Sequence, residues 1–260
     1  MTAFPLRGLA AVIYAVSAFA VAAPAVGESI VEANVKALEP GDEVAVSRIP
    51  DGVYLRSVND PDDMIWERLP EYRTRLAPAP PVHESVALRL DEDAPGMDVF
   101  FSLARTSERF YVRLRWRDET RDAATKHDRF RDAAAVQFAI GDEETSYIMG
   151  TGPDAPVNIW YWRSDANLVE DLAAGGPGST TRLDTQPVSG DSRYLSGEKP
   201  AANQWVVVMS RPITTAGEHQ VSFDRAQVPI AFALWQGKDG QRDGLKSVSE
   251  DWILVNLAAR

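Results

Sequence analysis

The chain has 260 residues, of which 45% are hydrophobic and 25% are charged, a composition typical of globular proteins. It contains no cysteine, which excludes disulfides, thiolate metal sites, iron–sulfur clusters and covalently attached c-type haem. The formal net charge of −11 argues against nucleic acid or an anionic membrane as partner, and it suits a positively charged protein partner.

The first 27 residues predict a cleaved secretory signal peptide. Arg7 supplies a short positive segment, and the apolar run Leu9–Ala23 follows it. Small residues suited to signal peptidase come next, at Ala20–Ala22, Ala23–Ala25 and Ala25–Gly27. The apolar run is too short for a membrane anchor, and no second run reaches the length that spans a bilayer. We therefore expect residues 1–27 to be removed on export and residues 28–260 to form a single domain without a membrane span.

Short strand-like runs recur along the rest of the chain. From Phe110 to Trp116 every second residue is large and apolar, and the residues between them are mostly arginines, which is the period of two of a half-buried strand. Similar runs are Val53–Ser57, Val86–Leu90, Val99–Ala104, Ala134–Ile140, Val157–Arg163, Trp205–Ser210, Gln220–Phe223, Pro229–Trp235 and Trp252–Asn256. No long amphipathic helix separates them. The predicted fold class is all-β, a mainly antiparallel β-sandwich with a few short helices and long loops.

Two segments are expected to interrupt this pattern. Pro70–Pro81 is rich in proline and has little periodicity, so we expect it to cross a surface or to span the two sheets. Leu168–Pro200 begins with a short helical possibility and becomes rich in glycine and serine. A loop of that length is usually functional or disordered.

The usual catalytic signatures are missing. The sequence has no G-x-S-x-G, no H-E-x-x-H and no glycine-rich phosphate loop ending in Lys-Ser/Thr. Its three histidines, His83, His127 and His219, do not lie at ligand spacing from one another and are expected to be surface or capping residues. A hydrolase that uses scattered carboxylates is an alternative with no motif to support it.

The strand Val157–Arg163 is unusual because it carries three adjacent aromatic residues. Ile159 and Tyr161 lie on one face of such a strand, and Trp160 and Trp162 lie on the other. The strand is either a central one that is covered on both sides, or one of its faces lines a pocket for a large flat ligand. A secreted carbohydrate-binding β-sandwich module, whose tryptophans stack on sugar rings, is the alternative function from a different class.

Several motifs, in their order along the chain, resemble the γ subunits of periplasmic molybdenum enzymes of the dimethyl sulfoxide reductase family. The resemblance covers nearly all of the chain after the signal, and the NIWYWR and LKSVS segments are specific to it. The motifs are DDMIW (Asp62–Trp66), DRFRDAAAVQFA (Asp128–Ala139), YIMG (Tyr147–Gly150), PVNIWYWR (Pro156–Arg163) and PIAFALWQGKDGQRDGLKSVSEDW (Pro229–Trp252).

The resemblance implies a cofactor and its ligands, namely one non-covalent haem b between an axial methionine and an axial lysine. Met149 matches the methionine of the family's IMG-like motif. Lys246 matches the lysine before the serine-containing run, and Lys238 in the same loop is the reserve candidate. Trp160 or Trp162, with the glycine-rich loop, is then expected to wall the porphyrin plane.

The resemblance also implies a role and partners. The chain is expected to have no catalytic activity alone and to be the electron-transfer subunit of a periplasmic heterotrimer. Its partners there are a molybdopterin-containing catalytic subunit and an iron–sulfur subunit. A periplasmic cytochrome c is the expected external electron partner.

Overall fold

The computed structural model describes residues 35–51, 58–91, 94–124, 129–141, 144–198, 202–214 and 217–258. The expected signal peptide, the expected strand at residues 53–57 and His127 lie outside this described part of the chain. The described residues belong to one compact unit, Asn34–Arg260. No helix within it is both long and apolar enough to cross a membrane.

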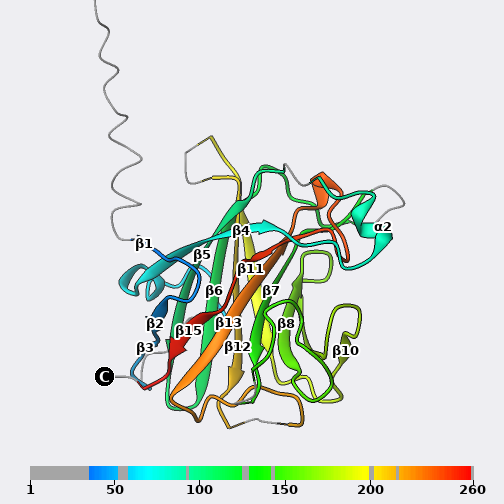
Figure 1. Cartoon of the computed structure of the whole chain (residues 1–260). Helices are drawn as coiled ribbons and strands as arrows, with labels where there is room; N and C mark the ends of the chain where they lie inside the picture. The colour runs from blue at the N-terminus through cyan, green and yellow to red at the C-terminus, as the bar shows by residue number, and fades with distance from the viewer. Residues whose placement is uncertain are drawn as a thin grey trace, which may run out of the picture. The chain divides into compact units, whose positions relative to one another are not determined.

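β-strands make up nearly all of the regular secondary structure in the described chain (Figure 1). The short helical segments are η1 (Trp66–Arg68), α2 (Glu84–Ala87) and η2 (Gly237–Asp239). The strands are β1 (Val35–Ala37), β2 (Glu43–Ala45), β3 (Ser47–Arg48), β4 (Glu71–Pro78), β5 (Met97–Arg105), β6 (Arg109–Arg117), β7 (Ala133–Ala139), β8 (Val157–Arg163), β9 (Leu168–Ala174), β10 (Thr181–Arg182), β11 (Ser189–Leu195), β12 (Gln204–Pro212), β13 (Gln227–Trp235), β14 (Ser247–Ser249) and β15 (Ile253–Asn256).

The strands form two facing layers that are joined through β14. One layer runs β10-β9-β8-β7-β13 and the other runs β4-β5-β6-β12-β11, and β14 pairs with both β13 and β4. Pairing along this path is antiparallel, and only the short strands β1, β2 and β3 add parallel pairs. Aromatic rings from the two layers meet in the core. The ring centroids of Trp116 and Trp162 lie 5.9 Å apart, and those of Phe101 and Phe232 lie 4.7 Å apart. The predicted antiparallel β-sandwich is confirmed.

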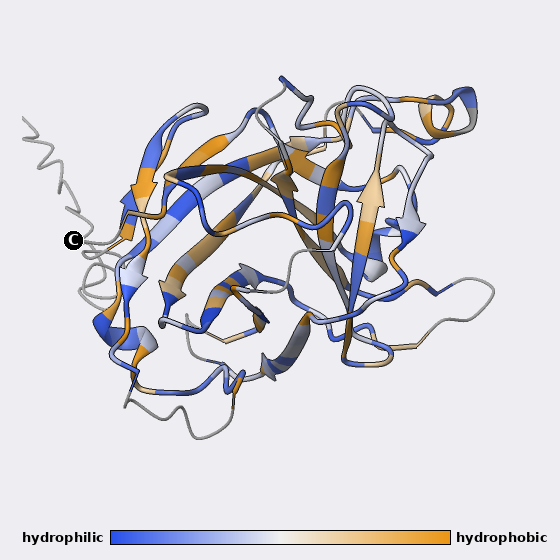
Figure 2. Cartoon of the chain, turned by 90° about the horizontal axis from the view of Figure 1, so that it is seen from below, coloured by the Kyte–Doolittle hydropathy of each residue, from blue (hydrophilic) through white to orange (hydrophobic). Residues whose placement is uncertain are grey.

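The hydrophobic core lies between the two layers. On β6 every second residue from Phe110 to Trp116 is at most 1% exposed, and on β8 Trp160 and Trp162 are fully buried. Figure 2 shows hydrophobic and hydrophilic residues alternating along the strands. Each such side chain contributes about 1.5–3 kcal/mol through the apolar surface that it removes from water. The alternation in the sequence therefore distinguishes the face of each layer that packs in the core from the opposite face.

The two segments expected to interrupt the sandwich are instead strands. Pro70–Pro81 contains β4, which pairs with β5 and β14 and buries Tyr72, Thr74 and Leu76 on one face. Its prolines stand at or beyond the strand ends, where a missing N–H does not break the ladder. Leu168–Pro200 contains β9, β10 and β11, so the expected long loop is wrong.

Two expected strands are also wrong. Val86–Leu90 overlaps α2 and begins as a helical turn, in which the Leu88 N–H donates to the Glu84 carbonyl at 3.0 Å. The Leu88 side chain is 87% exposed and does not pack in the core. Gln220–Phe223 forms no strand, although Val221 and Phe223 are buried. There the Val221 N–H donates to the Asn158 side-chain carbonyl at 3.2 Å, so a side chain takes the place of a neighbouring strand.

Candidate functional site

A cavity of about 490 Å³ lies on the outer face of the layer that contains β7, β8 and β13. Part of its floor is made of small residues at outward positions of two neighbouring strands. Ala135 on β7 pairs directly with Ala233 on β13, and Ala231 lies two residues along β13. The walls come from loops, including residues 79–86, 147–149, 177–180 and 243–246. The volume lies within the range of about 300–1,000 Å³ found for small-molecule sites.

Met149 enters this cavity from a tight turn just before β8. Its backbone is left-handed, with φ of 60°, and Gly150 follows at φ of 89°. A Cβ on residue 150 would lie 2.9 Å from the Ala174 carbonyl oxygen, so only glycine fits there. The Gly176 N–H donates to the Met149 carbonyl at 2.7 Å, and the Gln137 amide donates to the Tyr147 carbonyl at 2.9 Å. These bonds hold a strained residue in place, as is common at functional sites.

Lys246 enters from the opposite wall, on the segment between η2 and β14. Its carbonyl accepts a hydrogen bond from the Ala79 N–H at 2.8 Å, which fixes the backbone where the side chain starts. The residue is half-buried as a whole, but its amine lies deep in the cavity, 4.9 Å from the centroid of the Trp235 ring. Burial lowers the pKa of Lys246 to about 8, and the nearby Asp243 carboxylate opposes this shift.

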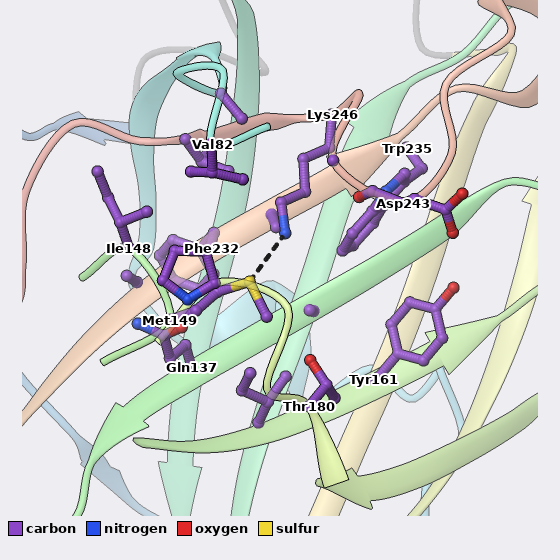
Figure 3. Close-up of a pocket in the computed structure, with 18 of the residues that line it drawn as sticks. Val82, Gln137, Ile148, Met149, Tyr161, Thr180, Phe232, Trp235, Asp243 and Lys246 are labelled. Carbon is purple, nitrogen blue, oxygen red and sulfur yellow. Dashed lines mark hydrogen bonds between the residues drawn. The ribbon is translucent and has the colours of Figure 1, made fainter. Parts of the chain in front are cut away.

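Met149 and Lys246 point toward each other across the cavity. The Sδ atom of Met149 lies 3.7 Å from the Nζ atom of Lys246, although the two residues are 97 positions apart in the sequence (Figure 3). Bonds from a metal to nitrogen and sulfur are about 2.0 and 2.3 Å. For an ion to lie between these two atoms, they would have to separate by about 0.6 Å, which two flexible side chains allow.

The other residues expected at the site lie elsewhere. Lys238 is in η2, where its exposed amine pairs with Glu119 at 3.3 Å and does not line the cavity. Trp160 and Trp162 are on the inner face of β8, fully buried in the core. Trp160 and Trp162 therefore do not wall this cavity.

Among the described residues, the aromatic side chains that line the cavity are Tyr147, Tyr161, Phe232 and Trp235, and the rings of Tyr161 and Trp235 pack edge to face with their centroids 5.4 Å apart. Sequence reasoning does not select them. A signal is present, since Ala135, Ala231 and Ala233 place small residues at every second position of two strands that the sequence predicts correctly. An outward face with such small side chains leaves room for a ligand.

Neither of the two described histidines, His83 and His219, lines this cavity. His83 and His219 are exposed, and His219 pairs with Glu218 at 3.8 Å. Within the described ranges, no three His, Asp or Glu side chains are grouped so as to hold a metal ion. The donors that fit a metal are thus one thioether and one amine in an apolar enclosure. A thioether is a soft ligand, and it is one of the known axial ligands of haem iron.

The chain is similar in sequence to several known proteins. Residues 63–184 match the family model described as "Ethylbenzene dehydrogenase". The chain is 34% identical to the putative respiratory nitrate reductase heme subunit ORF7 of Haloferax mediterranei, over 87% of this chain and 75% of that protein. It is 31% identical to the chlorate reductase subunit gamma of Ideonella dechloratans, over 74% of this chain and 77% of that protein.

The chain belongs to this family of oxidoreductase gamma and heme subunits. Among the members, the motifs most resemble dimethyl sulfide dehydrogenase. The comparison confirms this interpretation, because the chain is 54% identical to the dimethylsulfide dehydrogenase subunit gamma of Rhodovulum sulfidophilum, over 97% of this chain and 96% of that protein.

A solved structure shares the fold. A putative carbohydrate-binding protein from Bacteroides uniformis superposes with a TM-score of 0.53, covering 83% of this chain and 99% of that chain at 12% identity. At such low identity the likeness concerns the β-sandwich alone.

Proposed function

We propose that the chain is the electron-transfer subunit of a heterotrimeric oxidoreductase and that it binds one non-covalent haem b, with Met149 and Lys246 as axial ligands. The observation that carries the proposal is the 3.7 Å approach of the two donor atoms across the cavity. The cavity is mainly apolar, which suits a porphyrin. A relative named as a heme subunit adds support.

Lys246 has to be neutral to act as a ligand. A free lysine is charged at neutral pH, and the buried position lowers the pKa of Lys246 to about 8. The cavity thus brings the amine within about one pH unit of its neutral form before any ligand arrives. Competition between the proton and the metal then makes coordination depend on pH.

Met149 supplies the second donor without any proton to lose. A thioether favours ferrous over ferric iron, which raises the reduction potential. The bound haem would supply one-electron transfer. With two protein ligands on the iron, no coordination position is left for a substrate, and the chain alone has no catalytic activity.

Relatives that are named as gamma subunits support the presence of partner subunits in the proposed complex. We infer a molybdopterin-containing catalytic subunit and an iron–sulfur subunit, in a dimethyl sulfide dehydrogenase of the type named for the Rhodovulum sulfidophilum relative. Electrons would pass between these subunits and a periplasmic cytochrome c. The net charge of −11 suits docking of a basic cytochrome. The N-terminal signal segment supports export to the periplasm.

Absorption spectroscopy of the purified full chain, produced with ample porphyrin supply, tests the proposal. We expect a Soret band, sharp α and β bands on reduction, a pyridine haemochrome spectrum of the b type and one haem per chain. A colourless protein that binds no added haem would contradict it. Quenching of tryptophan fluorescence by oligosaccharides in such a protein would support the carbohydrate-binding alternative.

The cytochrome partner has its own test. Exposed charges are screened over about 10 Å at 0.1 M ionic strength, so the rate of electron exchange with a basic cytochrome c should fall as salt is added. A rate that does not change with salt would argue against electrostatic docking while leaving the haem proposal intact.

A further inference from the structure

One end of the cavity carries a positive charge that the proposed axial ligands do not use. The charged side chains among its described lining residues are Arg131, Asp243 and Lys246. Lys246 is accounted for as an iron ligand in the proposal above, and Asp243 is exposed beside it. Arg131 lies elsewhere, next to the start of β7. A flat apolar ligand alone gives no reason for a guanidinium in the lining.

The fold directs Arg131 toward the cavity. Arg131 lies two residues before β7 and lines the same cavity as Ala135 and Gln137 of that strand. The residue next to it is fixed, since the Asp132 carboxylate accepts hydrogen bonds from the Gly237 N–H at 2.9 Å and the Trp205 indole at 2.9 Å. Arg131 is therefore attached to an anchored segment of backbone.

The guanidinium of Arg131 belongs to a cluster in which positive charge exceeds negative charge. It pairs with Asp165 at 3.3 Å, and Arg163 shares the same carboxylate at 3.5 Å. Arg163 also approaches Glu170 at 3.7 Å, as does Arg182 at 3.5 Å. Three guanidiniums thus share two carboxylates. In addition, the Nε atom of Arg131 is buried and has no hydrogen-bond partner within the described part of the chain.

Tyr161 adds a second donor at the same place. Tyr161 and Arg131 both line the cavity. Burial raises the pKa of Tyr161, and the Arg131 guanidinium opposes the rise. The hydroxyl keeps its proton at neutral pH. In Figure 3 the Tyr161 ring lies along the edge of the cavity away from Gln137 and Ile148. A buried N–H donor without a partner, beside a protonated hydroxyl, forms a site at which a carboxylate can accept hydrogen bonds.

We propose that Arg131, with Tyr161 as a second donor, anchors a carboxylate of the ligand and so sets the direction in which the haem lies in the cavity. This rests on the proposed function, because haem b is a flat apolar ring that carries two propionates on one edge. That edge then faces the start of β7, and the apolar edge faces Gln137 and Ile148. Arg131 acts as a positioning residue, since it does not contact the iron.

The test compares two ligands in the full chain freed of haem. One is ferric haem b, and the other is its dimethyl ester, in which both propionates lack charge. A charge-assisted hydrogen bond corresponds to roughly a tenfold to hundredfold change in affinity. We expect the ester to bind the unmodified chain at least about tenfold more weakly. Arg131→Gln should weaken haem b by a similar factor and should no longer distinguish the two ligands.

Arg163→Gln is the matched control. It removes one positive charge from the same cluster and the same Asp165 partner, but Arg163 does not line the cavity. We expect it to keep the preference for haem b over the ester. Tyr161→Phe should reduce that preference only in part. The reduction potential gives a second readout, which should fall in Arg131→Gln because an uncompensated propionate stabilises ferric iron.

Each outcome decides between the alternatives. If Arg131→Gln prefers haem b over the ester as strongly as the unmodified chain does, the anchor is not Arg131. If the unmodified chain itself binds both ligands equally, no carboxylate anchor exists. If circular dichroism shows that Arg131→Gln does not fold, Arg131→Lys replaces it in the test. The comparison of haem b with its ester in the unmodified chain then decides whether a carboxylate anchor exists. Failure of the unmodified chain to bind either ligand contradicts the haem proposal itself, which is a distinct result.

Discussion

Trp160 and Tyr161 are neighbours in the chain, yet their rings lie on opposite sides of one sheet. The indole of Trp160 is fully buried between the layers, with its ring 6.3 Å from that of Phe110. The ring of Tyr161 lies 5.4 Å from that of Trp235, beside the cavity on the outer face. The aromatic strand therefore serves two purposes, because one face builds the core and the other builds the site.

This division predicts that the inner tryptophans affect stability but not the ligand. Trp162 is fully buried, and its indole N–H donates to the Asn167 side chain at 3.1 Å. Trp162→Phe should lower the free energy of unfolding by about 1–3 kcal/mol through lost packing and a lost hydrogen bond. The visible spectrum of the haem-loaded chain should stay unchanged. Denaturant titration and absorption spectra measure the two effects, and a shifted Soret band would show that Trp162 contacts the cofactor after all.

The sequence predicts the strands well, and with them the two faces of β8. It does not predict which face lines a ligand site, because an alternating pattern has the same period on both faces. The choice is made by loops from distant parts of the chain, such as the one that carries Lys246, which cover only one side of the sheet. β4 escapes prediction for a related reason, since prolines at its ends outweigh the alternation of Tyr72, Thr74 and Leu76 between them.

The candidate site can be predicted in part. The family resemblance selects Met149 and Lys246, and the structure brings them together. Composition alone gives no reason to select either residue. Arg131 and the alanine floor escape prediction, because an arginine before a strand and alanines within it are each ordinary until neighbouring strands place them around a single cavity.

The two axial candidates can be separated from the reserve by replacing each in turn. Met149→Leu keeps the volume and the apolar character, so the chain should fold with a change in free energy of unfolding below about 1.5 kcal/mol. Its haem should be lost or should show an altered spectrum and a lower reduction potential, because the thioether is gone. Lys238→Ala is the control and should keep the native spectrum, since Lys238 pairs with Glu119 at the surface. A native spectrum in Lys246→Leu together with an altered spectrum in Lys238→Ala would make Lys238 the ligand.

Lys246 should lower the stability of the haem-free chain. Its pKa is about 8 in the folded chain, against 10.5 for an unperturbed lysine, so between these values the unfolded chain holds more protons and stability rises with pH. Below pH 8 the full cost of burying the charge is present, up to about 3 kcal/mol. Lys246→Leu should therefore raise the free energy of unfolding of the haem-free chain at pH 7, and the gain should shrink toward pH 10.5. The same variant should lose native haem binding.

Urea titrations of both haem-free chains at about pH 7 and about pH 10 measure the difference. These two pH values span most of the interval between the folded and unfolded pKa values of Lys246. Lys238→Leu is the matched control, because its exposed amine has no burial cost to remove. Equal stability of Lys246→Leu and the unmodified chain at neutral pH would mean that the amine is hydrated in the haem-free cavity.

Two adjacent alanines, one at the floor of the cavity and one in the core, give a further prediction. Ala135 faces the cavity and Ala134 faces the core. Ala135→Leu should fill the floor and reduce haem binding at least about tenfold, while the haem-free chain, whose cavity has room for the larger side chain, should lose less stability than Ala134→Leu does. Ala134→Leu should overpack the core at a cost of about 1–3 kcal/mol, with haem binding retained in the folded fraction. Haem titration and thermal unfolding of both variants separate the effects. If Ala135→Leu binds haem normally, the ligand does not lie on the face formed by β7, β8 and β13, and the proposed site must be abandoned.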